Sequence, residues 1–537
     1  MPNDLLQLFI NSKTGAYNQT KTELIEIKSH AGVLIKGAAA MTLFSLINKL
    51  LGVFLRLFLS ARIGSEGMGL YQLIMSVYTM FSTFATAGFT VSVSRLIAEK
   101  DEKSHADSRL LFNNSFKASF LVSLVATALM LIGADFIAVR FLGDARCALP
   151  LRVLALSMPF MALAACLKGW FIAKERVAVT SSASLFEQIV KMSVIALFLN
   201  IIMAQTDDIG TLCQGIVYGV TVSEMCSFSY LLLFKILPER RRRDSSAATE
   251  TRRDSMRSLI SVTLPISLSV YLTSILHTAE TLLIPYVFES YSGDRADALS
   301  QFGMIRGMVV PILFFPFAFL ASLVSVFTPE ISRLNLLPDR APLRARISSV
   351  MSFVSLLSVA VGGLFFFLNY EIGEAFYPNE NTAQAIKILS LVTPFMYVET
   401  VSDGLLKAIG EQMQTLKFSV YNSILRVVLI LLFVSKTGET GYLWLLVISN
   451  SFTYFLCRRR LFKAVKVKPR IKSDIIFPLF CAIFGGVCAR FLLARLALSS
   501  VTASAFVGTC VYVTAFSLMI MLFSFERTKS LIARLKG

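Results

Sequence analysis

Charged residues are scarce in this chain of 537 residues: they make up 16% of it, against about 25% in soluble globular proteins. Histidine is almost absent, with only His30, His105 and His277. The eight cysteines include no CxxC pair and fall mostly within apolar runs, which argues against a zinc site or a disulfide framework. We therefore expect no metal and no cofactor. The composition excludes an ordinary soluble enzyme.

Apolar residues dominate the composition instead. Hydrophobic residues make up 55% of the chain and the mean hydropathy is +0.68. Apolar runs of about 20 residues, the length that spans a bilayer as a helix, recur almost from end to end. The runs are continuously apolar rather than alternating, which favours helices over barrel strands. We predict an all-α polytopic membrane protein with about fourteen transmembrane helices, in two pseudo-repeated six-helix lobes plus two C-terminal helices.

The longest polar loop divides the predicted spans. Six spans precede it and eight follow. We predict an N-terminal extension at residues 1–36, an N-lobe at 37–237 and a basic linker at 238–257. A C-lobe at 258–462, a basic loop at 463–474 and a final pair of spans with a tail at 475–537 would follow. Because six is even, both lobes enter the membrane from one side, as in a parallel repeat. A short similarity between residues 87–93 and 321–326 supports the repeat.

Basic residues are concentrated in alternate loops, and this pattern predicts topology. The other set of loops holds only a few, namely Arg140, Arg146, Arg295, Lys436 and Arg495. By the positive-inside rule, both termini lie in the cytoplasm of a bacterial cell-membrane protein. Topology and anionic lipid headgroups explain the run 240–243, so we expect membrane lipids as partners and no nucleic acid. The opposite loops are too short for an external catalytic domain.

Several cations lie inside predicted spans, where a charge is costly unless it meets a partner or a wet cavity. Lys49 and Arg56 are two helical turns apart and share one face of the first span. Arg306 lies a few residues into the eighth span. Together these three predict a central cavity that binds a multiply charged anion, because arginine offers a bidentate fork to phosphate oxygens. The alternative is that each pairs with a carboxylate or a helix carbonyl. Lys191 follows Glu187 by one turn, where an ion pair would neutralise both.

Two groups of ionisable residues are candidates for ion coupling. Glu399 and Asp403 are four residues apart on the tenth span and could share a proton or hold a cation; simple hydration near the membrane surface is the alternative. His277 and Glu280, three apart on the seventh span, could relay a proton or form an internally satisfied polar pair.

Proline interrupts several spans, most notably at Pro265, Pro311 and Pro394. A proline removes one backbone hydrogen bond and kinks the helix, which is tolerated beside a cavity or a neighbouring helix. These positions are candidate hinges for alternating access, and a rigid structural kink is the alternative at each.

Several motifs, taken in order, resemble the SpoVB-type polysaccharide flippases, of the superfamily that also holds the MurJ lipid II flippases and the MATE antiporters. The motifs are Lys49-Leu50-Leu51-Gly52 with Arg56, Ala61-Arg62-Ile63-Gly64, Glu66-Gly67-Met68-Gly69-Leu70-Tyr71-Gln72, Thr86-Ala87-Gly88, Arg95-Leu96-Ile97-Ala98-Glu99, Thr263-Leu264-Pro265-Ile266, Arg306-Gly307-Met308-Val309-Val310-Pro311, Pro329-Glu330-Ile331-Ser332-Arg333 and Leu405-Leu406-Lys407-Ala408-Ile409-Gly410. The resemblance covers nearly the whole chain after about residue 30.

The resemblance implies a transporter that turns undecaprenyl-pyrophosphate-linked sugars from the inner to the outer leaflet, alone or beside a cell-wall polymerase. In MurJ-like proteins a cationic cavity is thought to hold the pyrophosphate, and its basic residues match Lys49, Arg56 and Arg306. The cationic pair and the acid that MurJ-like proteins carry near the second span have no match at 70–72 and 80–82, so the SpoVB-like branch fits better. The cargo could be a peptidoglycan, spore-cortex or polysaccharide precursor.

Three other functions stay open at this stage. A MATE-like cation-coupled exporter would require an acid-rich cavity, whereas the central residues here are basic. A membrane glycosyltransferase or ligase using the same donor would bring a large outer loop with essential acids or histidine. A non-transporting assembly scaffold would tolerate loss of the cavity cations. We expect a transporter, without enzymatic activity.

Overall fold

The computed structural model describes the backbone at residues 3–101, 104–206, 208–236, 251–378, 382–467, 470, 472–496 and 498–536. It describes side chains within these ranges except at 3–42, 319, 321–326, 329 and 523–536. Throughout the described backbone the regular structure is helical, with no β-strand, as the continuously apolar runs predict. The all-α prediction is confirmed.

The helices fall into three consecutive groups. The first contains α1 Asn3–Thr86, α2 Phe89–Asp101, α3 His105–Phe136, η1 Ile137–Phe141, η2 Ala145–Cys147, α4 Ala148–Ala155, α5 Met158–Ala173, α6 Val177–Met203 and α7 Ile209–Ile236. The second contains α8 Arg252–Ser292, α9 Arg295–Phe302, η3 Gly303–Val309, α10 Val310–Phe314, α11 Phe317–Asn335, α12 Ala341–Phe367, α13 Asn369–Phe376, α14 Thr382–Ser390, α15 Thr393–Ala408, α16 Gln412–Leu429, η4 Ile430–Val434 and α17 Ser435–Val465. The third contains η5 Lys472–Ile476, α18 Phe477–Leu496 and α19 Val501–Lys536.

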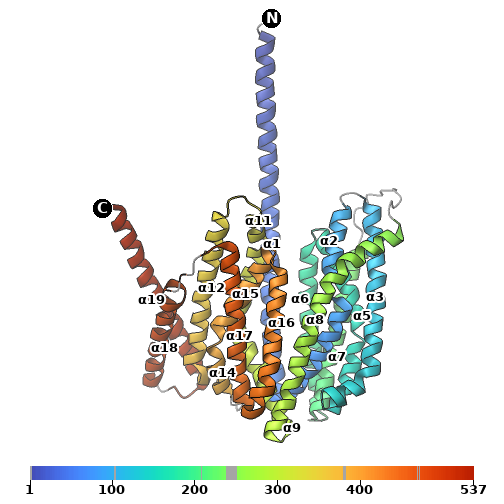
Figure 1. Ribbon diagram of the computed structural model, residues 1–537, viewed down its shortest axis with the longest axis vertical. Helices are drawn as coiled ribbons and strands as arrows, with labels where there is room; N and C mark the ends of the chain where they lie inside the picture. The colour runs from blue at the N-terminus through green and yellow to red at the C-terminus, as the bar shows by residue number, and fades with distance from the viewer. Residues whose placement is uncertain are drawn as a thin grey trace.

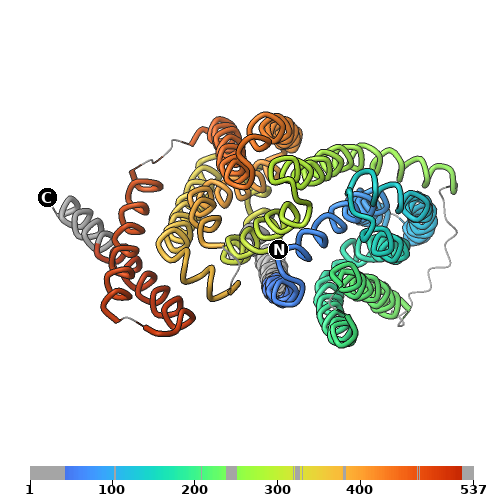
Figure 2. The backbone as a smooth tube through the Cα atoms, turned by 90° about the horizontal axis from the view of Figure 1, so that it is seen from below, coloured from blue at the N-terminus to red at the C-terminus, as the bar shows by residue number. Residues whose placement is uncertain are grey.

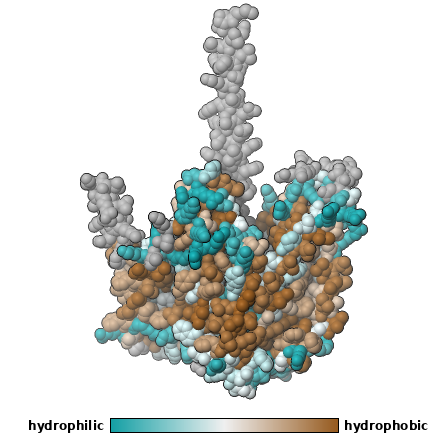
Figure 3. Space-filling model, in the orientation of Figure 1, coloured by the Kyte–Doolittle hydropathy of each residue, from teal (hydrophilic) through white to brown (hydrophobic). Residues whose placement is uncertain are grey.

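Nine helical segments of the described chain are long and apolar enough to cross a membrane, or eleven if two bent pairs each count as one span. Two of the nine, 43–101 and 412–465, are 59 and 54 residues long, far more than the roughly 20 residues that one crossing needs. The predicted number of fourteen spans therefore stays a prediction. Exposed apolar side chains form a broad band between polar upper and lower rims, as expected of a surface that faces lipid (Figure 3).

Glycine allows the chain to reverse direction with almost no loop. Gly64 inside α1 and Gly438 inside α17 have φ of 63° and 61°, the left-handed region that glycine enters without a Cβ clash. By contrast, α8 begins with a side-chain cap: the hydroxyl of Thr251 accepts a hydrogen bond from the backbone N–H of Asp254. Helix α8 thus begins at Arg252, inside the predicted linker 238–257, whose remaining residues up to 250 lie outside the described ones.

The first two groups of helices form two lobes that stand side by side, with α18 and α19 at the outer edge of the second (Figure 2). We call α1–α7 the N-lobe and α8–α17 the C-lobe. Helix α8 starts beside α2 and α3 and runs obliquely across to the C-lobe (Figure 1). The start of α1 and the end of α19 project from the same side of the bundle, the upper side in Figure 1.

The lobes repeat one sequence pattern. Met158-Pro159-Phe160-Met161 at the start of α5 recurs as Thr393-Pro394-Phe395-Met396 at the start of α15. The same spacing matches Glu187 and Lys191 of α6 with Asn422 and Arg426 of α16. At a spacing nine residues shorter, Ser223-Glu224 of α7 corresponds to Ser449-Asn450 of α17. The chain bends by 44° just before Pro159 and by 55° just before Pro394. This repeat is clearer than the short similarity of residues 87–93 and 321–326.

At the lower end of the bundle the lobes touch through reciprocal glycine contacts. A Cβ built on Gly303 would lie 1.9 Å from the carbonyl oxygen of Ser65, and one built on Gly69 would lie 2.1 Å from that of Leu299. Gly69 follows Ser65 by four residues, as Gly303 follows Leu299, so the two contacts are related by the repeat. The hydroxyls of Ser65 and Ser300 also bond across this junction at 2.7 Å. We call these contacts the lower seam.

Helices α18 and α19 pack against the edge of the C-lobe, on α12 and α13. The hydroxyl of Tyr512 donates a hydrogen bond of 2.8 Å to the carbonyl oxygen of Ala360, and Arg490 pairs with Glu371 at 2.6 Å. This pair of helices is therefore attached to one lobe, which leaves the space between the lobes open to the central site.

Candidate functional site: a cationic cavity between the lobes

A polar cavity of about 510 Å³ lies between the lobes, above the lower seam. Its N-lobe wall comes from α1 on both sides of the bend at Gly64, and its C-lobe wall comes from α8 and η3. Its lining is Arg56, Tyr71, Gln72, Met75, Ser76, Thr79, Val270, Thr273, Ser274, His277, Thr278, Thr281, Phe302 and Arg306. No aspartate or glutamate is among these described residues, so the walls present hydroxyl, amide and cationic groups.

Arg56 and Arg306 face this cavity from opposite lobes. The Arg56 side chain is exposed and, among the described side chains, forms no ion pair, so its five donors are available to a ligand. Lys49 is half-buried two turns earlier on the same helix but does not line the cavity. The structure thus places two of the three predicted cations in one cavity and leaves Lys49 outside its lining.

Arg306 is held in place by an acid and a tyrosine. Its Nε donates to the hydroxyl of Tyr442 at 2.6 Å, and its guanidinium donates to Glu280 Oε1 at 2.8 Å. The Glu280 carboxylate, 2% exposed, also accepts a 3.0 Å bond from Arg426, which in turn donates to Asn450 at 3.2 Å. Two guanidinium groups share one carboxylate, so this cluster keeps one net positive charge next to the cavity.

The predicted coupling residues lie in two different surroundings, one at the cavity and one on α15. His277 lines the cavity, while the carboxylate of its neighbour Glu280 bonds to the two arginines. On α15 Asp403 pairs with Lys407 at 2.6 Å, and Glu399 contacts the hydroxyl of Thr400 at 3.4 Å. Their roles in coupling stay predictions.

The predicted hinge prolines occupy three different settings. Pro265 lies within the continuous helix α8. Pro311 lies in the first turn of α10, directly after the π-helical segment η3 that carries Arg306. Pro394 starts α15 after the 55° bend, where a proline's missing N–H costs nothing. Because η3 has a widened turn at the cavity wall, its geometry sets the direction of the Arg306 side chain.

A second buried group of charges, which sequence spacing revealed only in part, lies inside the N-lobe. The predicted Glu187–Lys191 pair is confirmed, with 3.4 Å between Nζ and Oε1. Lys168 of α5 joins it, 3.7 Å from the other Glu187 oxygen, instead of reaching a membrane surface. Glu224 of α7, 9% exposed, lies within electrostatic range of all three. We call these four residues the N-lobe cluster. The match with Arg426 and Asn450 in the repeat could have revealed it.

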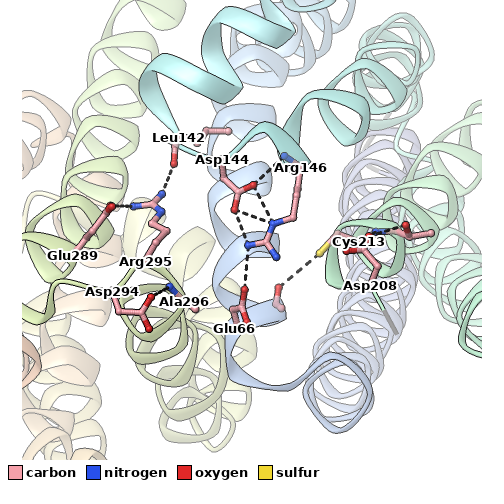
Figure 4. A network of polar contacts seen from close by, with 12 residues as sticks. Glu66, Leu142, Asp144, Arg146, Asp208, Cys213, Glu289, Asp294, Arg295 and Ala296 are labelled. Carbon is pink, nitrogen blue, oxygen red and sulfur yellow. Dashed lines mark hydrogen bonds and ion pairs between the residues drawn. The ribbon is translucent and has the colours of Figure 1, made fainter. Parts of the chain in front are cut away.

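Further polar contacts surround the lower seam (Figure 4). Arg146 bonds to Asp144 and Glu66 at 2.8 and 3.1 Å, which ties the loop after η1 to α1. Arg295 of α9 crosses between the lobes: it donates to the carbonyl oxygen of Leu142 and pairs with Glu289 at 2.9 Å. Near Arg146, hydrogen bonds from the side chain and backbone of Thr211 lower the pKa of the Asp208 carboxyl in the loop before α7. The lower end of the bundle is therefore closed.

An apolar groove of about 430 Å³ runs between the C-lobe and α18. Its walls come from α12, α15, α17 and α18, and most of the lining side chains are aliphatic or aromatic. Arg458 and Asp474 are its charged lining residues among those described. The groove is suited to a hydrocarbon chain.

The sequence of this chain matches a known family and several known proteins. The family described as "Polysaccharide biosynthesis protein" matches residues 34–335. Stage V sporulation protein B of Bacillus subtilis (strain 168) is 23% identical over 380 residues, covering 70% of this chain and 73% of that protein. Lipid II flippase MurJ of the same organism is 23% identical over 168 residues, 30% of this chain and 31% of its own length.

Solved structures share the fold at low sequence identity. The lipid II flippase MurJ in an inward closed conformation superimposes with a TM-score of 0.67 at 12% identity, over 91% of this chain and 99% of MurJ. An inward-facing MATE family multidrug transporter gives a TM-score of 0.59 at 16% identity, over 80% of this chain and 99% of that protein. The chain is therefore a multi-pass membrane protein with the fold that flippases and MATE transporters share, and the predicted relationship is confirmed.

Proposed function

Because the chain belongs to the polysaccharide biosynthesis protein family, we propose that it is a flippase that moves undecaprenyl-pyrophosphate-linked sugars from the inner to the outer leaflet. The observation that carries this proposal is the pair Arg56 and Arg306, which face one polar cavity from opposite lobes. A pyrophosphate carries several negative charges, and arginine matches its oxygens with a planar fork of donors. Lys49, two turns before Arg56 on α1, would add a third positive charge to the path.

The proposed path uses the three environments that the fold provides. The pyrophosphate binds between the arginines, the sugars contact the hydroxyl and amide groups of the walls, and the prenyl chain stays in apolar surroundings, for which the groove beside α18 is suited. The upper side of Figure 1 is then the cytoplasm, which holds both termini, and the lower seam is the closed outer gate. Rocking of the lobes would open the seam and release the cargo, with no bond made or broken.

A MATE-like exporter of cationic compounds is the second candidate, because that family shares the fold. Its cargo would need acidic groups in the cavity. The lining contains cations and no acid among the described residues, and Glu280 is buried behind Arg306 in two ion pairs. The charge of the walls therefore favours an anionic cargo.

The test is the amount of lipid-linked precursor in cells depleted of the protein and complemented with Arg56→Ala or Arg306→Ala at verified membrane abundance. We expect precursor to accumulate with either variant and to disappear with the wild type. Arg62→Ala is the matched control: Arg62 lies on the same helix, is exposed, and contacts Phe58 and Met203 outside the cavity. The glycan found on the lipid would identify the cargo.

Equal precursor levels in depleted and complemented cells would refute the lipid-linked cargo and favour the exporter. If Arg62→Ala failed as completely as Arg56→Ala, the cavity would lose its special role. Lys49→Ala, tested beside them, separates a residue that binds the pyrophosphate from one that only adds positive charge along the path. Loss of a binding residue would abolish transport. Loss of a residue that only adds positive charge would reduce transport by an amount that shrinks as added salt screens that charge.

A further inference from the structure

The N-lobe cluster contains a largely buried residue, Glu224, whose carboxylate has no hydrogen-bonding partner among the described residues. Glu224 is 9% exposed, and among the described residues it forms no hydrogen bond and no ion pair within 4.0 Å. Glu187, in contrast, lies within 4.0 Å of both Lys168 and Lys191. A buried, unpartnered carboxylate is costly in its charged form, and it becomes far cheaper when it binds a proton.

The matching region of the C-lobe differs, because its buried carboxylate is paired with two cations. There Arg426 replaces Lys191 and Asn450 replaces Glu224, and the buried acid Glu280 accepts bonds from Arg306 and Arg426. A guanidinium group does not release its proton in proteins, and a carboxylate held by two guanidinium groups has little tendency to gain one. Glu280 and its two guanidinium partners therefore have a fixed charge.

The N-lobe cluster is built from groups that do titrate. The groups that face Glu224 are Lys168 from α5, Glu187 and Lys191 from α6, and Tyr78 from α1. With both carboxylates ionised, the two lysines balance them and the cluster is neutral. One added proton gives it a single positive charge. Two carboxylates in one low-dielectric site favour this change, because each raises the cost of ionising the other.

Binding of a metal cation fits this cluster less well than binding of a proton. Two ammonium groups already lie beside the carboxylates and would repel an added metal ion. Among the described residues, no group of three or more His, Cys, Asp or Glu side chains could hold a metal ion. A proton needs one carboxylate oxygen and no coordination shell.

We propose that Glu224, with Glu187 as its carboxylate neighbour, is a proton-binding site that sets the charge the N-lobe presents to the central cavity. Tyr71 connects the two regions: it lines the cavity and lies within electrostatic range of both Lys191 and Arg56. A proton on Glu224 adds one positive charge on the N-lobe side of the cavity and strengthens its hold on an anion. Its loss weakens that hold. This consequence for cargo rests on the proposed flippase function, whereas the proton site does not.

The site is tested by infrared difference spectroscopy of the full-length protein in lipid nanodiscs during a pH titration, without any cargo. Protonated carboxyl groups have a carbonyl stretch that ionised ones lack. We expect one such band to appear as the pH falls and to be lost in Glu224→Gln. Glu289→Gln is the control and should keep the band, because Glu289 pairs with Arg295 at the lower end, away from the cluster.

Glu187→Gln provides a second, independent variant. Removing its negative charge leaves Glu224 alone with two lysines, so the band should move to lower pH rather than disappear. Absence of a titrating band in the wild type, or an unchanged band in Glu224→Gln, would overturn the proposal. A band that responded to sodium in place of potassium at constant pH would indicate a metal cation instead. Since no readout involves cargo, a failed precursor assay and a failed titration are distinguishable.

Discussion

Replacing Gly303 with alanine should force the lower seam apart. The added Cβ would lie 1.9 Å from the carbonyl oxygen of Ser65 and 2.4 Å from the backbone nitrogen of Gly69, and both are backbone atoms that cannot rotate away. Cβ atoms essentially never lie closer than 3.0 Å to such atoms, so the helices must separate by about 1.1 Å at this point. Such overpacking costs about 1–3 kcal/mol.

This cost applies only to conformations in which the seam is closed. The equilibrium should therefore shift toward the conformation with the lower end open, by about 5- to 150-fold for a difference of 1–3 kcal/mol. Pulsed electron spin resonance between labels at Val139 of η1 and Tyr286 of α8, both exposed and on opposite lobes, measures this shift as a growing long-distance population.

Gly52→Ala is the matched control for Gly303→Ala. Gly52 is a helical glycine of α1 whose added Cβ would meet nothing closer than Gln188 at 4.0 Å. It should leave the distance distribution unchanged. If Gly303→Ala gave the wild-type distribution at undiminished thermal stability, the close approach of the lobes would not be a feature of the closed state, and the seam would not act as a gate.

Two substitutions test the packing around the site. Glu280→Ala leaves the guanidinium groups of Arg306 and Arg426 buried without their shared acid and should destabilise the protein by about 3–5 kcal/mol, visible as a lower midpoint in thermal unfolding in detergent; an unchanged midpoint would show that the arginines are solvated. Tyr512→Phe removes the bond to Ala360 and should cost only about 0.5–1.5 kcal/mol, while precursor transport is retained; lost transport would give α19 a direct role.

Particular residues show how far sequence reasoning reached. The cost of an intramembrane charge singled out Arg56 and Arg306, and helical spacing predicted the Glu187–Lys191 pair. Neither argument could find the partners of Arg306. Glu280 precedes Arg306 by 26 residues on α8, and Tyr442 follows it by 136 residues on α17; both meet η3 only in the folded protein. Glu224 of α7 likewise comes near Lys168, Glu187 and Lys191 only in the folded protein.

The sequence by itself determined that the protein lies in a membrane and that it is helical, because both depend on local composition. Long apolar runs require lipid, and in lipid a helix forms all of its own backbone hydrogen bonds. It also determined which residues place an energetically costly charge inside the membrane. Tertiary structure alone decided which of those charges are neutralised and which face a ligand. Electrostatic pairing depends on distances of a few ångströms between helices, and only packing sets those distances. Arg306 is therefore anchored by Glu280, whereas Arg56 stays open to the cavity.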